Sequence, residues 1–271
     1  MQLIIVLILI GLFSAVFFLV FKAKPKPLPL PEITVVKRTL TEQVAFYQGL
    51  NNAEKADFEL RLLAFLEKVR ITGVKTVVSD ADRVLVAAAA IIPIFAFKGW
   101  EYPNIHEVLV YPGSFNTDFA IRGEGRNVLG MVGNGPMKDV MILSKQDLHQ
   151  DFSDPHSSSN TAVHEFVHLI DAADGDTDGC PRTFIPPQYV VPWLKRIHQE
   201  IRLIKMGESD INPYATTNEA EFLAVAAEYF FEQPDRMQEK HPELYDLLVQ
   251  VFMPGKKQVR FSGKLPEEQK K

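Results

Sequence analysis

The run His164-Glu165-Phe166-Val167-His168 is the part of the sequence whose residue types and spacing most directly indicate chemistry. Histidines at positions i and i+4 of a helix lie one turn apart on the same face, so both imidazoles can bind one zinc ion. Glu165 follows the first histidine directly, beside the metal, where a carboxylate can take a proton from an attacking water. The motif therefore predicts a hydrolytic zinc centre with His164 and His168 as ligands and Glu165 as general base.

A catalytic zinc needs a third protein ligand, and two carboxylates compete for that position. Asp174 stands ten residues after His164, as in enzymes with the pattern His-Glu-x-x-His-x-x-Gly-x-x-His/Asp. Asp171 replaces the glycine on which that route depends, which disfavours the turn back to the metal. Glu221 lies in an otherwise apolar helical segment, where an unpaired carboxylate is costly. A glutamate from a second helix is thus the alternative to Asp174.

Three further side chains have both a functional and an ordinary interpretation. Asp171 and Glu228 could each accept the ring N–H of a ligand histidine, or could be carboxylates without such a role. The phenol of Tyr214 could hydrogen-bond the oxyanion of a tetrahedral intermediate, or could serve packing. Four other histidines lack partners at ligand spacing and are predicted to be surface or capping residues: His106, His149, His198 and His241. His156 is close to the motif in sequence but lies in a polar loop, and it is not expected to be a ligand.

Helices must position these groups, and the hydrophobic periodicity predicts them. One helix over about 160–173 carries the histidines, and another over about 217–232 carries the glutamates. Further helices are predicted at 52–70, 80–92, 192–206 and 241–252, strands at 107–111 and 140–143, and loops or a hairpin over 113–138. The expected fold class is α+β, a mostly helical domain with a small sheet.

The first residues predict a membrane anchor. Residues 3–21 are uncharged and, apart from Gly11 and Ser14, apolar. As a helix they would span about 28 Å, close to the roughly 30 Å hydrocarbon core of a bilayer. A cleavable signal peptide is disfavoured because the charged n-region is missing. We expect a transmembrane anchor over 1–23, a Pro/Lys linker over 24–31, a zinc metallopeptidase domain over 32–254 and a disordered tail over 255–271.

The charges around this anchor predict its orientation. Basic residues crowd the side that leads into the domain: Lys22, Lys24, Lys26, Lys37 and Arg38. The positive-inside rule then predicts a single-pass protein of the inner (cytoplasmic) membrane with a cytoplasmic catalytic domain.

The net charge of -5 excludes direct nucleic-acid binding as the expected function. The lone Cys180 cannot form an intramolecular disulfide, which agrees with a reducing compartment.

The chain resembles the Mlc titration factor A family of zinc peptidases. The similarity covers roughly residues 30–253, with the motifs in the same order. It runs through residues 83–90, His106-Glu107-Val108-Leu109-Val110-Tyr111-Pro112, the segment 164–171 ending His168-Leu169-Ile170-Asp171, Phe184-Ile185-Pro186-Pro187 with Trp193, Tyr214-Ala215-Thr216-Thr217, and Glu221 to Glu228-Tyr229-Phe230-Phe231. Differences from the soluble members are the N-terminal anchor and Asn218-Glu219, where Asp-Pro is familiar.

This resemblance implies a zincin-type fold with a gluzincin-like site. Its ligands to one Zn²⁺ per chain would be His164, His168 and Glu221, with Glu165 as general base and Tyr214 beside the active site. It also implies aminopeptidase-type activity on a peptide or protein substrate. At least one member binds a glucose-responsive transcriptional repressor, so a transcriptional regulator is an expected partner. The alternative is a membrane-tethered regulatory protein that sequesters a transcriptional repressor and whose zinc is mainly structural. A structural zinc site would not need Glu165 as a base.

Overall fold

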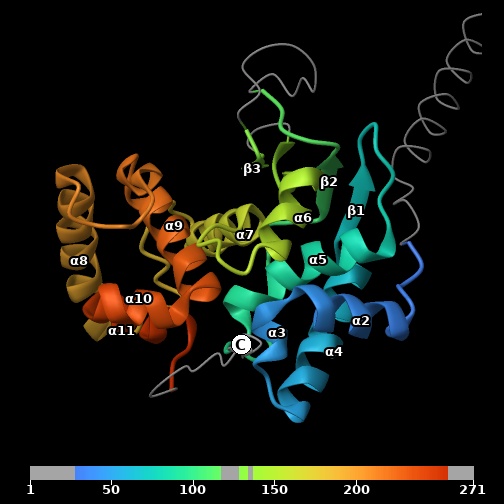
Figure 1. The fold of residues 1–271 in the computed structure, drawn as a ribbon, viewed down its shortest axis with the longest axis horizontal. Helices are drawn as coiled ribbons and strands as arrows, with labels where there is room; N and C mark the ends of the chain where they lie inside the picture. Colours follow the sequence, from blue (N-terminus) through green and yellow to red (C-terminus); the bar gives the residue numbers. More distant parts are fainter. Residues whose placement is uncertain (1–27, 117–127, 134–136, 256–271) are drawn as a thin grey trace, which may run out of the picture.

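The computed structural model describes residues 28–116, 128–133 and 137–255, and it shows helices packed around a small mixed sheet (Figure 1). The strands are β1 (Arg70–Gly73), β2 (Glu107–Tyr111), β3 (Gly130–Val132) and β4 (Val140–Ser144). They lie in the order β1-β2-β4-β3, with β1, β2 and β4 parallel and β3 antiparallel to β4 at one edge. The predicted α+β class is confirmed.

Helix α5 forms the centre of the half that carries the sheet. This half contains α2 (Ile33–Gln43), α3 (Ala45–Gln48), α4 (Asn52–Lys68), α5 (Asp80–Ile91) and α6 (Lys145–Ser153). The alanine-rich part of α5 is fully buried, because small side chains let α2 and α4 pack closely against it. Ser79 and Asp82 form a capping box at its start, and Pro93 lies in the short 3-10 turn that follows it.

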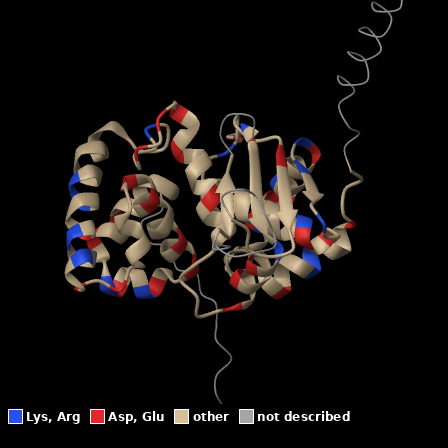
Figure 2. Cartoon of the chain, turned by 90° about the horizontal axis from the view of Figure 1, so that it is seen from above, with Lys and Arg blue, Asp and Glu red and all other residues tan. Residues whose placement is uncertain are grey.

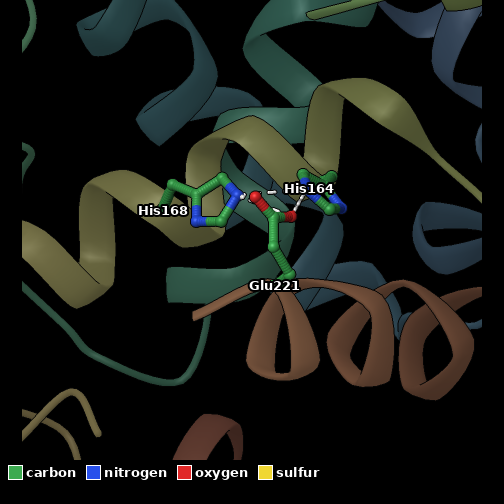
Figure 3. Close-up of side chains that lie close together, drawn as sticks. All are labelled: His164, His168 and Glu221. Atoms are coloured by element: carbon green, nitrogen blue, oxygen red, sulfur yellow. Dashed lines mark hydrogen bonds and ion pairs between the residues drawn. The ribbon is translucent and has the colours of Figure 1, made fainter. Parts of the chain in front are cut away.

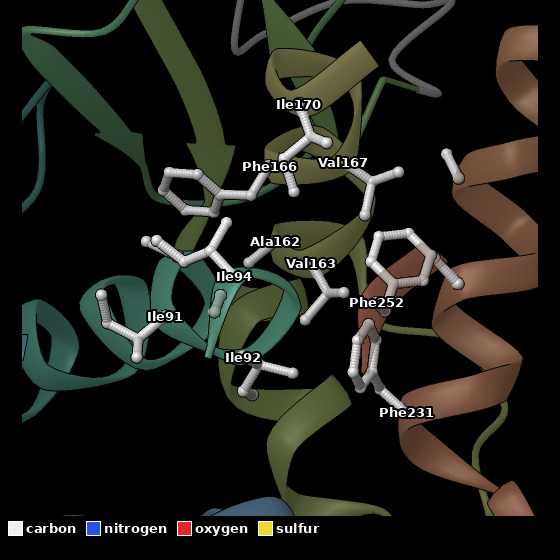
Figure 4. Close-up of a cluster of buried hydrophobic side chains, with 14 of the residues drawn as sticks. Ile91, Ile92, Ile94, Ala162, Val163, Phe166, Val167, Ile170, Phe231 and Phe252 are labelled. Carbon is white, nitrogen blue, oxygen red and sulfur yellow. The ribbon is translucent and has the colours of Figure 1, made fainter. Parts of the chain in front are cut away.

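The other half is entirely helical among the residues described. It consists of α8 (Pro187–Met206), α9 (Glu219–Glu232), α10 (Pro234–Lys240) and α11 (Pro242–Phe252). Helix α7 (Thr161–Asp171) lies between the two halves (Figure 1). Its apolar side chains Ala162, Val163, Phe166, Val167 and Ile170 point into a core shared with Ile91, Ile92, Ile94, Phe231 and Phe252 (Figure 4). The core therefore fixes α7 from both sides.

Several elements differ from the sequence-based expectation. The helix expected over 52–70 ends at Lys68, and Arg70 begins β1 instead. Helices α2, α3, α6 and α10 have no counterpart among the predicted helices. The segment 113–138 contains strand β3. The expected membrane anchor falls in residues 1–27, outside the described residues, as does the tail from residue 256. Within the described ranges, every helix is too short or too polar to cross a bilayer.

Charged side chains of both signs are interspersed along the outer helices (Figure 2). His241 occupies the cap position between α10 and α11, as the capping prediction allowed, but it is 8 % exposed and so is not a surface residue. Its Nε2 lies 2.8 Å from Asp210 Oδ1, and its Nδ1 lies 3.4 Å from Glu200 Oε2. Asp210 also accepts hydrogen bonds from Tyr229 and Arg236. This network ties the helices around α9 together.

The His241 network predicts a pH dependence of stability. The ion pair with Glu200 and the bond to Asp210 raise the pKa of His241, although burial lowers it. Its contribution is therefore fully present below the ordinary histidine pKa of about 6.5 and is lost as pH rises through the raised pKa. We expect His241→Gln to lower the free energy of unfolding by about 1–3 kcal/mol at pH 6, with the difference shrinking at alkaline pH. Denaturant titrations across this range, with the exposed His156→Gln as control, measure it; a difference that grows with pH would contradict the assignment.

Candidate metal centre

Helix α7 presents the His-Glu-x-x-His motif toward α9. Asn160 is the N-cap of this helix, and its side chain accepts a hydrogen bond from the Val163 N–H. His164 and Glu165 are 9 % and 7 % exposed, so two polar groups of this helix are held in a nearly dry environment. Burial of this kind is tolerated where partners compensate for the lost hydration.

Helix α9 brings Glu221 to the two histidines (Figure 3). Asn218 caps α9 by accepting the Glu221 N–H, which places Glu221 in its first turn. Helix α9 packs against α7, and its Ala224, Ala226 and Ala227 are fully buried. Small side chains of this kind let neighbouring helices approach closely. The Glu221 carboxylate thus faces both imidazoles, as the close-up shows.

The spacing of the three side chains fits a single metal ion. His164 Nε2 lies 2.9 Å from Glu221 Oε2 and 3.0 Å from His168 Nε2, and His168 Nε2 lies 3.4 Å from Glu221 Oε2. Ligands of a tetrahedral ion at 2.0–2.1 Å are separated by roughly 3.3–3.4 Å. Two imidazoles and one carboxylate are also a donor set typical of catalytic metal sites. Among the residues described, they are the group with ligand atoms within 4.8 Å of one another.

Asp174, the competing carboxylate, lies elsewhere. It belongs to the 3-10 turn Ala172–Asp174 that follows α7. Its carboxylate accepts the backbone N–H groups of Asp176 at 3.2 Å and Arg182 at 2.8 Å. Asp174 therefore organises the loop after α7, and Glu221 is the carboxylate that faces the histidines.

Charge interactions among the three residues are strong. Although burial lowers the pKa of His164, hydrogen bonds to Glu221 and Glu228 raise it to about 10. Burial also opposes ionisation of Glu221, but its bonds to His164 and His168 lower its pKa to about 2. A metal ion binding here must displace the proton of His164, so its affinity falls at acid pH.

Glu228, one of two carboxylates considered as partners of the imidazoles, is the one that orients His164. His164 Nδ1 lies 2.6 Å from Glu228 Oε1. The other oxygen of Glu228 accepts the Asn160 N–H at 2.7 Å, and the Asn160 amide donates to Glu232. A carboxylate at Nδ1 holds the ring so that Nε2 keeps its lone pair for a metal.

Removal of Glu228 should therefore weaken metal binding. We expect Glu228→Ala to lower zinc affinity by about 10- to 100-fold while leaving the three ligand residues in place. Competition with a chromophoric chelator measures the affinity. Glu232→Gln is the matched control, because it alters a carboxylate that contacts Asn160 but no histidine. Equal zinc affinity in Glu228→Ala and the unmodified chain would contradict this role.

Asp171, the other carboxylate, connects the two helices of the site instead. It is fully buried, and its Oδ2 accepts the Gly179 N–H at 2.8 Å. Gly179 has a φ of 73°, and a Cβ there would lie 2.2 Å from the carbonyl oxygen of Glu219, at the start of α9. Only glycine allows this approach without strain. The end of α7 is thereby fixed to the beginning of α9.

Glu165 lies on the same helical turn as His164, and its side chain is largely buried from solvent. Burial raises its pKa, while the neighbouring His164 and His168 lower it. A buried carboxylate with a raised pKa binds a proton more readily than one in water, and a general base must take up a proton during the reaction. Its position is compatible with the predicted role.

Tyr214 lies in the 3-10 turn Pro213–Thr216 just before α9, and its ring centroid is 6.1 Å from that of His164. Its side chain is 54 % exposed, so it forms an open edge of the site. Partial burial and the carboxylates of Glu221 and Glu165 raise its pKa. The phenol therefore keeps its proton at neutral pH and can donate a hydrogen bond.

Two residues at the site were not singled out from the sequence. Asn160 is one, because the hydrogen bond from its backbone N–H to Glu228 depends on tertiary packing. Gly130 of β3 packs against Glu165, and a lone glycine in a loop-like segment carries no signal for such a contact.

Comparison with known proteins finds a matching family model and several relatives. The model of the family described as glucose-regulated metallo-peptidase M90 matches residues 25–253. A protein of Pectobacterium atrosepticum named Mlc titration factor A is 28% identical over 198 residues, which cover 67% of this chain and 72% of the relative. The Mlc titration factor A of Escherichia coli O9:H4 is 28% identical over 221 residues, 75% of this chain and 80% of the relative. An uncharacterized protein of Synechocystis is 28% identical over 224 residues, 79% and 81% of the two chains.

Proposed function

Since this chain belongs to the M90 family of glucose-regulated metallopeptidases, we propose that it is a zinc-dependent peptide hydrolase. The convergence of His164, His168 and Glu221, with Glu165 on the same helical turn, is the observation that carries the proposal. Zinc suits this set of two imidazoles and one carboxylate, which leaves a coordination position open for substrate. When bound, zinc would polarise the peptide carbonyl and lower the pKa of water.

The side chains of this protein would move the proton and hold the substrate. Glu165 would accept a proton from the attacking water and pass it to the departing amine, a role favoured by its buried position. Tyr214 would donate its phenolic hydrogen to the oxygen of the peptide carbonyl as negative charge develops there. Glu228 would keep the His164 ring in one orientation through the bond to Nδ1.

We assign the peptidase to the aminopeptidase type on the resemblance to its family. The experiment compares an aminoacyl fluorogenic amide with the same amide carrying an N-acetyl group, using the purified zinc-loaded chain. Hydrolysis of the free amine and not of the blocked amide supports this type. Hydrolysis of internal bonds in blocked peptides would assign an endopeptidase instead, and hydrolysis of neither would overturn the peptidase proposal.

A regulatory binding protein is the second candidate. Its support is the name of the relatives, Mlc titration factor A, which describes titration of Mlc by those proteins. By analogy, this chain would sequester a transcriptional regulator, with zinc mainly structural. Glu165 argues for the enzyme, because a structural site has no use for a buried base beside it. Full binding of a regulator by a Glu165→Gln variant that lacks hydrolysis would show that the two functions are separable.

We further propose that residues 1–23 anchor the protein in the cytoplasmic membrane, with the peptidase domain in the cytoplasm. The support is the uncharged apolar run and the basic residues that follow it. A reporter enzyme active only in the cytoplasm, fused after Lys271, should be active, and one active only outside should be silent. The reverse pattern would contradict this orientation.

A further inference from the structure

We propose that Gly130, in the edge strand β3, is a positioning residue that fixes the carboxyl group of Glu165. The inference rests on the proposed hydrolytic function and adds a residue to it. A Cβ atom built on Gly130 would lie 2.7 Å from Glu165 Cγ and 2.8 Å from Glu165 Oε1. It would also lie 2.9 Å from Thr161 Cγ2. The strand backbone therefore touches the side chain of the proposed base directly.

The contact involves one face of α7 and one position of the strand. Thr161 and Glu165 are four residues apart, so their side chains lie one above the other on the helix. Gly130 pairs with Leu143 of β4, and the neighbouring bond from the Ser144 N–H to the Leu129 carbonyl is 2.8 Å. Gly133 donates to Val140 at the other end of β3. Because both ends of β3 are hydrogen-bonded to β4, and both strands contact α7, β3 cannot easily move away from α7.

Gly130 is the first residue of β3, and a glycine in a strand often marks the close approach of another group. Here the approaching group is a carboxyl that is 7 % exposed and that must keep one geometry to act on a water molecule. Any larger residue at 130 would push Glu165 away or rotate it. The absence of a side chain at Gly130 thus allows the Glu165 carboxyl to keep its orientation. The proposed metal ligands are not among the atoms in this contact.

The test compares Gly130→Ala with Gly113→Ala in the full-length, zinc-loaded protein. A Cβ at Gly113 would meet only Gln146 Oε1 at 3.4 Å, an ordinary contact, so this variant controls for the loss of a glycine. We expect Gly130→Ala to lower kcat by roughly ten- to hundredfold, with KM and zinc affinity close to those of the unmodified chain. Gly113→Ala should change none of these quantities.

A double-mutant cycle shows whether Gly130 acts through Glu165. In the Glu165→Gln background, Gly130→Ala should produce almost no additional loss, because the group that it displaces no longer acts as a base. Multiplicative losses in the cycle would overturn the proposal. So would a Gly130→Ala variant with unchanged kcat.

A binding measurement separates this inference from the proposed function. Acetohydroxamic acid chelates a metal ion through two oxygens and gives up a proton, which a neighbouring carboxylate can accept. Its affinity for the zinc-loaded protein should fall in Gly130→Ala as it does in Glu165→Gln, whether or not a peptide is hydrolysed. Absence of hydrolysis by the unmodified chain would refute the peptidase; unchanged acetohydroxamate affinity in Gly130→Ala would refute the role of Gly130.

If Gly130→Ala does not fold, Gly130→Ala/Thr161→Ser keeps the test decisive. Serine removes the methyl group that the new Cβ would meet and retains the hydroxyl, so the contact with Glu165 is the one that remains. A folded double variant with reduced kcat supports the proposal. Loss of folding in both variants would assign Gly130 to the fold and overturn its role at the base.

Discussion

Glu221→Ala should lose nearly all of its zinc at micromolar free metal and all measurable hydrolysis. Its carboxylate lies 2.9 Å from His164 Nε2 and 3.4 Å from His168 Nε2, so removal leaves two imidazoles and no third protein ligand. It also removes the negative charge that balances a divalent ion in a partly buried site. Metal analysis of the purified variant by mass spectrometry, together with the hydrolysis assay, measures both effects.

Asp174→Ala is the matched comparison for Glu221→Ala, because both changes delete a carboxylate near the motif. The Asp174 carboxylate accepts backbone N–H groups in the loop after α7, so its loss should reduce stability modestly and leave zinc content nearly intact. Zinc lost from Asp174→Ala and retained by Glu221→Ala would overturn the assignment of the third ligand.

Glu165→Gln should retain stoichiometric zinc and the same thermal stability, while kcat falls by about two to four orders of magnitude. Glutamine has nearly the same shape as glutamate but cannot accept the proton of the attacking water. Because Glu165 is buried and lies beside His164, water or buffer cannot easily replace it. Steady-state kinetics with parallel zinc analysis decides the matter, and near-normal turnover in a zinc-loaded variant would refute the general-base role.

The two helices of the site could be predicted because their signals are local. The histidine spacing and the apolar positions of α7 are repeated every turn, and α9 shows a comparable pattern around Glu221. The meeting of these helices is not a local property. Spacing alone left Asp174 and Glu221 in competition, and family resemblance favoured Glu221 before the packing of α7 on α9 placed it beside the histidines.

Other parts of the site depend on contacts that no periodicity records. Glu228 and Asp171 had the same expected role, yet one binds His164 and the other binds the Gly179 N–H. His241 had no neighbour in the sequence that indicated burial, because Glu200 and Asp210 reach it from distant segments. The fold class followed from composition and pattern, whereas these pairings required the tertiary structure.

Stepwise return of zinc to the metal-free, full-length chain tests the central claim most directly. Zinc is first removed with a chelator, and bound metal and hydrolysis of an aminoacyl amide are then measured in the same samples. The account predicts that turnover rises in proportion to bound zinc and levels off at about one zinc per chain, as expected for a three-ligand catalytic site. Hydrolysis that persists in the metal-free protein, or full zinc occupancy without any hydrolysis, would contradict it.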